Sequence, residues 1–444
     1  MDTNKLLRQY GWGEHPRFPE IAKRAAYYSK SLSEGELLAV LDREFKHQNR
    51  FTMDTNCVPI KYYGILGTDY DAKTKNQICT AAKLPVAIQA ALMPDAHLGY
   101  ALPIGGVIAL DNAISPSFVG FDIGCRMHCS ILNIDPDDFM KHREELANAL
   151  MKSTSFGIGS VSVNAYTNHD VMSNSFWNEV HTLRDLKEHA RSQLGSSGGG
   201  NHFADLMIGT SLKDWRFQKE GKQFVALVTH SGSRGTGHKL ATYYSKKAKD
   251  WAKFNTKGIP NGYEWLPMDE GIGEEYFYVM SLMLAYAKAN HELIHKNFTH
   301  RTTIRALEVI QNYHNFAAIE NGYVVHRKGA TPAHVGNMGI IPGSMGTASY
   351  IVKGLGNTDS LHSASHGAGR SCSRTQAKKE LDVKAHAEHV KMHDILTIGV
   401  GPDESYQAYK NIERVMELQR SLVKPIARME PKVVIMGDKS DDGD

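Results

Sequence analysis

Hydrophobic positions recur with a helical period in five stretches of the chain, and each stretch predicts an amphipathic helix. These stretches cover residues 140–152, 176–193, 238–254, 275–309 and 405–428. Between them lie short runs of β-branched and apolar residues, bounded by glycine-rich turns, which predict strands. The strand-like runs are AAKLPVAIQAALMP, IGGVIAL, CSILNI, FVALVTHSG, YVVHRKG, ILTIGVG and KVVIMG. Helices and strands that alternate in this irregular way predict an α+β fold with mixed sheets and flanking helices.

The N-terminal part of the chain differs from the rest. Residues 1–56 are polar and helix-prone, and SLSEGELLAVLDREF has apolar positions at helical spacing after a capping serine. No Pro-rich or Ser-rich linker divides the middle of the chain. We therefore expect a helical N-terminal extension over 1–56, a single large domain over 57–437 and a short polar tail over 438–444.

Composition places the chain among soluble globular proteins and outside the disordered class, since 41% of its 444 residues are hydrophobic and 22% are charged. No apolar run approaches the roughly 20 residues that a membrane-spanning helix needs, and MDTNKLLRQYGW is not a secretory signal. We expect a cytoplasmic protein without a membrane partner. The five cysteines are too scattered for a disulfide framework, which leaves a thiol free to bind a metal.

The net charge of +3 neither supports nor excludes a nucleic-acid partner. A local group formed by Lys246, Lys247 and Lys249 could bind phosphate. Because these lysines fall on a helical pattern, a solvated helix face is the favoured interpretation.

Candidate chemistry is concentrated in five segments that combine glycine-driven turns with metal-binding or anion-binding side chains. They are MPDAHLGYALPIGG, GFDIGC, GSSGGGNHFAD, THSGSRGTGH and SASHGAGRSCSR. One such segment is weak support for a site, because glycine turns with a histidine occur in many folds. Five of them in one chain predict a shared functional centre.

A metal site is indicated first by GFDIGC, where Asp122 and Cys125 flank a turn that contains Gly124. Such a turn can direct a carboxylate and a thiolate toward one point, and a thiolate can bridge two cations. His202, His230 and His314 add imidazoles from three other loops. Cysteine together with histidine suggests zinc as readily as manganese on chemical grounds alone.

Phosphate binding is indicated by two glycine-rich stretches, Gly198–Asn201 and Pro342–Ser349, whose backbone N–H groups can approach phosphate oxygens closely. Neither is a Walker loop, because no GKS or GKT follows. Arg234, Arg370 and Arg374 lie beside glycine turns, and arginine binds phosphate in a bidentate manner. The small neighbours of His366 leave its ring nitrogen accessible for attack on phosphorus.

The order of these segments resembles the RtcB family of RNA ligases over roughly residues 59–437. The residues that carry the resemblance are MPDAHLGY, FDIGC, GGGNHF, HSGSRG, HNFA, HRKGAT, PGSMGTASY and HGAGRSCSR. The resemblance, not the spacing, implies the substrate and the metal. It implies a GTP- and manganese-dependent enzyme that joins RNA 3′-phosphate or 2′,3′-cyclic phosphate ends to 5′-hydroxyl ends, in RNA repair or tRNA splicing.

The resemblance also implies roles for single residues. Cys125 would bridge two Mn²⁺ ions, with Asp122 and His202 at one and His230 and His314 at the other. His366 would be the nucleophile that takes GMP from GTP, with Asp95 beside it. Arg234 and Arg374 would contact RNA phosphates. The expected nucleotide contacts are Asn201, Asp205, Asn315, Pro342, Gly343, Ser344, Met345, Ser349, Gly367, Ala368, Gly369 and Met436.

Three departures from the family pattern affect this interpretation. Met436 stands where the family usually has a lysine, with Lys432 and Lys439 as candidate substitutes, and Asp205 replaces a longer glutamate. Around the metal cysteine, Gly124, Arg126 and His128 differ from the common DINCGVR pattern. Two alternative functions follow: a metal-dependent cyclic-phosphate phosphoesterase that does not use GTP, and a noncatalytic protein that binds RNA ends.

Overall fold

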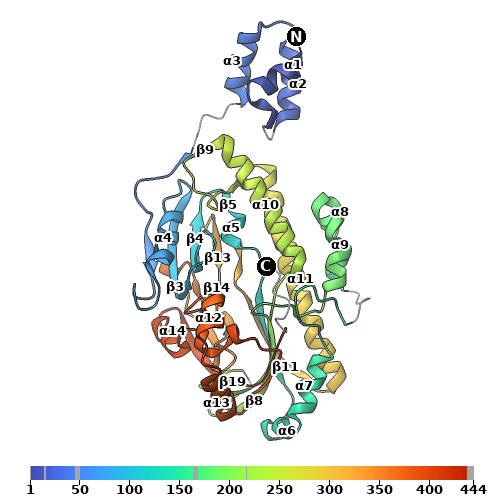
Figure 1. Ribbon diagram of the computed structural model, residues 1–444, viewed down its shortest axis with the longest axis vertical. Helices are drawn as coiled ribbons and strands as arrows, with labels where there is room; N and C mark the ends of the chain where they lie inside the picture. Colours follow the sequence, from blue (N-terminus) through green and yellow to red (C-terminus); the bar gives the residue numbers. More distant parts are fainter. Residues whose placement is uncertain (1, 15–16, 46–50, 164–168, 217, 438–444) are drawn as a thin grey trace.

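A computed structural model describes residues 2–14, 17–45, 51–163, 169–216 and 218–437 (Figure 1). Two large sheets and a set of flanking helices form the catalytic body, so the α+β prediction is confirmed. Within the described residues no helix has both the length and the apolar character needed to cross a membrane.

The larger sheet has eight strands and curls strongly. Along the main path its order is β11 (Ala306–Tyr313), β6 (Arg126–Leu132), β8 (Gln223–Ser231), β7 (Phe203–Ser211), β19 (Val423–Met436), β16 (Ser349–Gly354) and β15 (Met338–Ile341), and β18 (Leu396–Ile398) pairs with β19. Its two edges meet where the side chain of Asn312 on β11 donates to the Ile340 carbonyl and accepts from the Ile340 N–H, at 3.2 and 2.8 Å. This contact brings loops from both edges close together.

The smaller sheet has five strands in the order β12 (Asn315–Glu320), β13 (Tyr323–Lys328), β4 (Ile104–Leu110), β3 (Ala87–His97) and β2 (Ile60–Tyr62). Alternate residues of β3 face opposite sides, as expected of a strand. Ala90 and Leu92 pack in the core against helices, whereas Ala91 and Met93 pack toward β15 and β16 of the larger sheet. The smaller sheet is therefore buried on both faces.

Helices cover the outer faces of both sheets. Those packed near the smaller sheet include α4 (Ala72–Ala81), α5 (Pro116–Val119), α10 (Arg234–Asn255) and α11 (Gly271–Thr302), with α9 (His181–Gln193) beside them. The larger sheet is covered by α6 (Pro136–Lys141) and α7 (Arg143–Met151). The expected helices at 140–152, 176–193 and 238–254 correspond to α6 and α7, to α8 (Phe176–Glu179) and α9, and to α10.

Two helix predictions need correction. The helix expected over 275–309 ends at Thr302, because Thr303 adopts a left-handed conformation (φ 60°) and residues 306–313 pair with β6. The helix expected over 405–428 is wrong for most of its length. Only α14 (Ile412–Leu418) is α-helical there, and β19 begins at Val423.

The N-terminal residues form a small helical unit of α1 (Thr3–Gln9), a 3₁₀ turn, α2 (Phe18–Tyr28) and α3 (Glu34–Phe45). At the start of α3 the Glu36 carboxylate accepts from the backbone N–H of Ser33 (2.9 Å), which is the glutamate half of a capping box, and from the Ser33 hydroxyl (2.6 Å). Leu7, Ile21 and Leu37 are fully buried in a core made only of residues between 6 and 45. The chain joins the catalytic body at β1 (Phe51–Thr52), which pairs with β9 (Thr256–Lys257). Strand β1 therefore lies before the expected domain boundary at residue 57.

Candidate metal centre and its cavity

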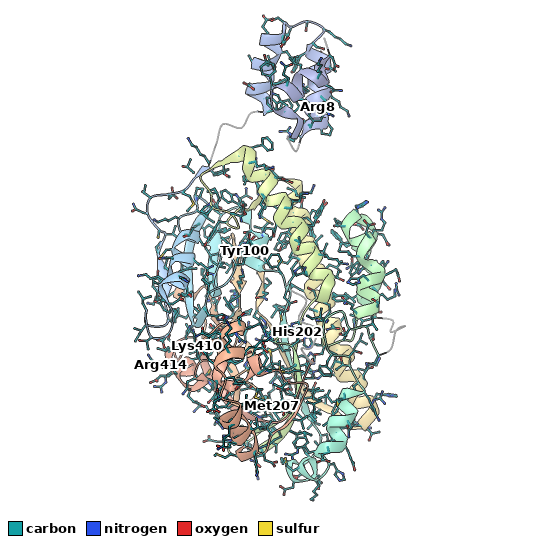
Figure 2. All side chains as sticks on the ribbon, in the orientation of Figure 1. Arg8, Tyr100, His202, Met207, Lys410 and Arg414 are labelled. Carbon is teal, nitrogen blue, oxygen red and sulfur yellow. The ribbon has the colours of Figure 1, made fainter. Side chains whose placement is uncertain are left out.

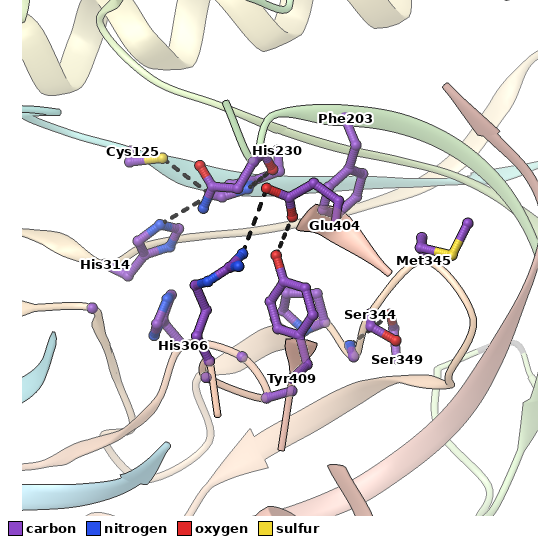
Figure 3. A pocket seen from close by; sticks show the side chains of 18 of the residues that line it. Cys125, Phe203, His230, His314, Ser344, Met345, Ser349, His366, Glu404 and Tyr409 are labelled. Carbon is purple, nitrogen blue, oxygen red and sulfur yellow. Dashed lines mark hydrogen bonds and ion pairs between the residues drawn. The ribbon is translucent and has the colours of Figure 1, made fainter. Parts of the chain in front are cut away.

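A cavity of about 300 Å³ lies where strand ends and loops of the two large sheets meet. Its wall combines metal-binding side chains with glycine turns, and Figure 3 shows Cys125, His230, His314 and His366 together across from Ser344 and Ser349. All twelve residues expected to contact the nucleotide line this cavity: Asn201, Asp205, Asn315, Pro342, Gly343, Ser344, Met345, Ser349, Gly367, Ala368, Gly369 and Met436.

The GFDIGC turn positions the first two predicted ligands. Gly124 adopts φ +73°, and a Cβ atom there would lie 3.1 Å from the Leu284 side chain, so glycine suits both the backbone and the packing. The Cys125 N–H donates to the Asp122 carbonyl (3.2 Å), which closes the turn. As a result both side chains point toward the cavity.

The five predicted metal ligands converge in one connected group. Cys125 Sγ lies 3.1 Å from His230 Nε2 and 3.5 Å from His202 Nε2. His230 Nε2 is 3.2 Å from His314 Nε2, and His202 Nε2 is 3.0 Å from Asp122 Oδ2. Residues from four different parts of the chain therefore share one small volume.

The chemistry of this group fits bound cations. His230 Nδ1 donates its proton to the Asn201 carbonyl (3.0 Å), so its Nε2 carries a lone pair that faces Cys125 and His314. Burial lowers the pKa of His230 to about 3 and that of His314 well below its usual range, which keeps both rings neutral. Neutral imidazoles are the form that binds metal.

The two anionic donors differ in protonation. Burial and the Asp122 carboxylate raise the pKa of the Cys125 thiol well above its usual range, so a cation binding at the sulfur displaces a proton. Burial also opposes ionisation of Asp122, but the hydrogen bond and charge of His202 outweigh it and bring the pKa of Asp122 down to about 2. The donor set of one sulfur, one carboxylate and three imidazoles suits divalent transition metals.

His366 lies next to this group and is held by Asp95. The buried Asp95 carboxylate accepts from His366 Nδ1 at 2.7 Å and from its backbone N–H at 3.1 Å, so Nε2 is the ring nitrogen that Asp95 does not occupy. The ring centroids of His366 and His314 are 4.9 Å apart. Burial alone would raise the pKa of Asp95, but the bond to His366 and the charge of Lys410 lower it.

The two arginines expected at RNA phosphates have different surroundings. Arg374 lines the cavity and pairs with Asp403 at 2.7 Å and with Glu404. Arg234 does not line the cavity: it is 9% exposed, and its guanidinium lies 3.2 Å from His202 Nδ1 and 3.3 Å from Ser196 Oγ. Arg234 thus contacts the rear of a metal-ligand ring and not an open phosphate site.

Sequence reasoning missed Glu404 and Tyr409, which also line the cavity. The Tyr409 hydroxyl donates to Glu404, and Glu404 in turn pairs with the cavity arginines (Figure 3). Glu404 lies just before the helix that was wrongly expected over 405–428, and Tyr409 lies near its start. The helix prediction therefore left no loop at this place in which a site residue would have been sought. The acidic pair after the Gly401–Pro402 turn was the available signal.

Met436 makes the cavity wall apolar at a position where a nucleotide contact is expected. Met436 packs with Met345 and Val434 in a small apolar cluster at the cavity. Lys432 does not take the place of the missing lysine, because its Nζ donates to the His393 carbonyl (2.9 Å) and lines a different pocket. Lys439 lies outside the described residues.

Buried sulfur, imidazole and carboxylate donors beside His366 form a group that suits metal binding, and the comparisons with known proteins give the enzyme class. Residues 77–437 match the family model described as tRNA-splicing ligase RtcB. The chain is 32% identical to the RNA-splicing ligase RtcB of Escherichia coli K12 over 87% of this chain and 99% of that protein. It is 32% identical to the tRNA-splicing ligase RtcB of Methanococcus maripaludis over 81% of this chain and 91% of that protein. The chain belongs to the RtcB family.

Proposed function

We propose that this protein is an RNA ligase that joins RNA 3′-phosphate or 2′,3′-cyclic phosphate ends to 5′-hydroxyl ends through a guanylylated His366. The family membership supports the ligase class, because relatives in bacteria and archaea carry the names RNA-splicing or tRNA-splicing ligase. The single observation that carries the mechanism is the bond from His366 Nδ1 to Asp95, which leaves Nε2 as the ring nitrogen that can act as the nucleophile beside the candidate metal-ligand group.

The reaction follows from what this nitrogen can do. A 2′,3′-cyclic phosphate is first opened by water to a 3′-phosphate. His366 Nε2 attacks the α-phosphorus of GTP and pyrophosphate leaves. An oxygen of the RNA 3′-phosphate then takes the guanylyl group, which frees the histidine. Finally the 5′-hydroxyl attacks the activated 3′-phosphorus and GMP leaves.

Residues of this chain assist at defined points. Asp95 holds the His366 ring in the tautomer that can attack. The glycine turns at Pro342–Ser349 and Gly367–Gly369 provide close approach for the nucleotide, and Arg374 provides a guanidinium for phosphate once it exchanges its carboxylate partners. Cys125, Asp122, His202, His230 and His314 would hold two Mn²⁺ ions, which when bound would act as Lewis acids on phosphoryl oxygens.

The defining test is covalent labelling. Protein incubated with radiolabelled GTP and Mn²⁺ should form a GMP adduct that survives denaturation, and His366→Ala should form none, because the nucleophile is gone. His386→Ala, which changes a histidine away from the cavity, is the matched control and should label normally. Absence of an adduct with wild-type protein across several divalent metals contradicts the proposal, and sealing of 3′-phosphate to 5′-hydroxyl RNA is the second measurement.

One observation favours a second candidate, a cyclic-phosphate phosphoesterase that does not use GTP. The nucleotide wall is apolar at Met436, and the buried Asp205 has a pKa raised well above its usual range by burial, so its carboxyl is neutral there. Metal-dependent opening of a 2′,3′-cyclic phosphate with no response to GTP would identify this activity.

A further inference from the structure

Three residues from the glycine-rich segments take no part in the metal group, yet they lie together on the surface. Tyr100 follows the MPDAHLG turn, Phe121 precedes Asp122, and His238 lies in the second turn of α10. The ring centroids of Tyr100 and Phe121 are 5.9 Å apart, and those of Phe121 and His238 are 5.3 Å apart. We call these three residues the aromatic platform.

The platform is exposed, which distinguishes it from core aromatic packing. Tyr100 is 41% exposed and Phe121 is 38% exposed, and His238 is exposed as well. Single exposed aromatic residues are common, but here Phe121 joins Tyr100 and His238 in one row of exposed rings, and contiguous exposed apolar surface is a mark of interaction sites. Figure 2 labels Tyr100 and His202 on the same body of the molecule.

The platform adjoins the side of the metal group that is open to solvent. The Asp122 side chain is 33% exposed, in contrast to the 8% of its partner His202, and Phe121 is its immediate neighbour in the chain. The Ser233 hydroxyl donates to the Ile123 carbonyl (2.6 Å), which fixes the start of α10 to the same turn. A polymer with its end at the metal group can leave the site across these rings.

Positive charge continues from the platform along α10. Lys246 and Lys249 follow His238 at i+8 and i+11, so they share its side of the helix and extend about 16 Å beyond it. Lys246 is exposed and Lys249 is half-buried. Neither has a carboxylate partner among the ion pairs of the described residues. Aromatic faces followed by unpaired lysines are the features that bind single-stranded nucleic acid.

We propose that Tyr100, Phe121 and His238 stack bases of the single-stranded RNA next to the end being joined, and that Lys246 and Lys249 bind its phosphates. This rests on the proposed ligase function, which supplies RNA as the substrate. Stacking tolerates any base, because each base has a π face, so the platform selects unpaired RNA and not a sequence.

Ligation kinetics test the platform with matched variants. Tyr100→Ala and His238→Ala should each raise the KM for an RNA of about ten nucleotides roughly tenfold, the loss expected for one stacked base, with a small effect on kcat. Tyr243→Ala is the control, since Tyr243 is 37% exposed but follows His238 by five positions, about 140° around the same helix. Rates are divided by the GMP adduct that each variant forms without RNA, which separates misfolding from lost RNA contact.

Abasic RNA identifies the contact as stacking. Abasic nucleotides next to the joined end, placed in the 3′-phosphate strand or the 5′-hydroxyl strand in turn, should raise the KM of wild-type protein for one strand and leave the KM of the variants unchanged. An equal abasic effect in wild type and variants overturns the proposal, as does a KM in both variants equal to that of Tyr243→Ala.

Salt dependence tests the lysines, and direct binding keeps the platform testable if ligation fails. Lys246→Ala and Lys249→Ala should each reduce the slope of log affinity against log salt by about 0.7, whereas Lys247→Ala, whose ammonium lies over the Tyr243 ring, should not.

If wild-type protein forms no adduct, the ligase proposal fails alone, and fluorescence anisotropy with single-stranded RNA still decides the platform. Equal affinity of wild type and Tyr100→Ala in that assay, or tighter binding of duplex RNA, would contradict it.

Discussion

At the scale of single residues, the proton on the His366 ring is placed by one buried carboxylate. Asp95 Oδ2 accepts both the ring Nδ1–H and the backbone N–H of His366. Lys410 adds positive charge nearby, since its Nζ donates to the Pro94 carbonyl (3.3 Å) and to the Ala96 carbonyl. Asp95 therefore orients the reactive nitrogen of His366, although the two residues lie more than half of the chain apart in the sequence.

Asp95→Asn should slow formation of the GMP adduct by about 10²-fold or more, because the amide cannot hold the ring as an ionised acceptor. The measurement is a single-turnover rate with labelled GTP. Asp69→Asn is the control, since Asp69 is a buried carboxylate that pairs with Arg414 (3.4 Å) outside the cavity. An unchanged rate in Asp95→Asn would remove Asp95 from the proposed mechanism.

Asp205 predicts a pH effect on stability. Burial raises the pKa of Asp205 well above its usual range, and its Oδ1 has no hydrogen-bond partner. A folded-state pKa above the unfolded value of about 3.9 means that the protonated carboxyl stabilises the fold at low pH, and this stability is lost as pH rises through the folded-state pKa.

Asp205→Asn, which does not titrate, should therefore unfold at a higher temperature than wild type near neutral pH, and the difference should shrink as pH falls. Thermal unfolding without nucleotide across a pH series measures this change. Asp269→Asn, at an exposed carboxyl, serves as the control and should show no pH-dependent gain. A difference that grows as pH falls would reverse the assigned sign.

At the scale of elements, the start of α10 connects the glycine loop to the metal ligands. Arg234 has a left-handed backbone (φ 59°), and its guanidinium crosses Gly198 to reach His202. A Cβ on Gly198 would lie 1.6 Å from Arg234 Nη1. One loop glycine therefore makes room for the contact behind the metal-ligand histidine.

Gly198→Ala should weaken Mn²⁺ binding by about tenfold or more, because displacement of Arg234 releases the His202 ring. Gly200→Ala is a close control: Gly200 also has positive φ (+74°), but a Cβ there meets nothing within 4 Å. Metal titration of the two variants measures the difference. Equal affinities would show that backbone strain, and not the Arg234 contact, governs the site.

Element prediction from sequence succeeded where one pattern dominated and failed where two competed. The run IGGVIAL is β4 without change, and the α10 periodicity held because its apolar face packs on the core. In 405–428, helical spacing competed with pairing to β7 and β16, and Asn411 capped only a short helix. Pro425 and Pro431 lie at register shifts in β19, a tertiary arrangement that local spacing does not reveal.

The candidate site shows the same division. The candidate metal ligands and His366 could be predicted because short motifs carry them, whereas their convergence depends on two sheets whose pairing the motifs do not specify. Glu404 and Tyr409 were missed because their loop lacks a motif of its own. The rear position of Arg234 followed from a left-handed helix start, which arginine rarely adopts.

At the scale of the whole molecule, the helical unit and the catalytic body have separate cores. The core of the unit contains only residues between 6 and 45, and the family match begins at residue 77. The body begins at Phe51, whose ring lies 6.1 Å from that of Trp251 and 5.6 Å from that of Trp265. We therefore expect removal of sequence to begin to cost stability at Phe51, and the predicted domain boundary at residue 57 stays a prediction.

Deletion of residues 1–50 should leave the ligation rate and the unfolding temperature of the body close to those of the full chain, because no core residue of the body is lost. Deletion of residues 1–56 removes Phe51 as well and should lower the free energy of unfolding by about 2 kcal/mol, the scale of one large apolar contact. Chemical denaturation of both truncated proteins, with ligation assayed in parallel, compares them. Deletion of residues 1–50 could instead cause a large loss of ligation while the free energy of unfolding stays unchanged. That result would give the helical unit a direct part in holding RNA, because the loss of activity would not come from a loss of stability.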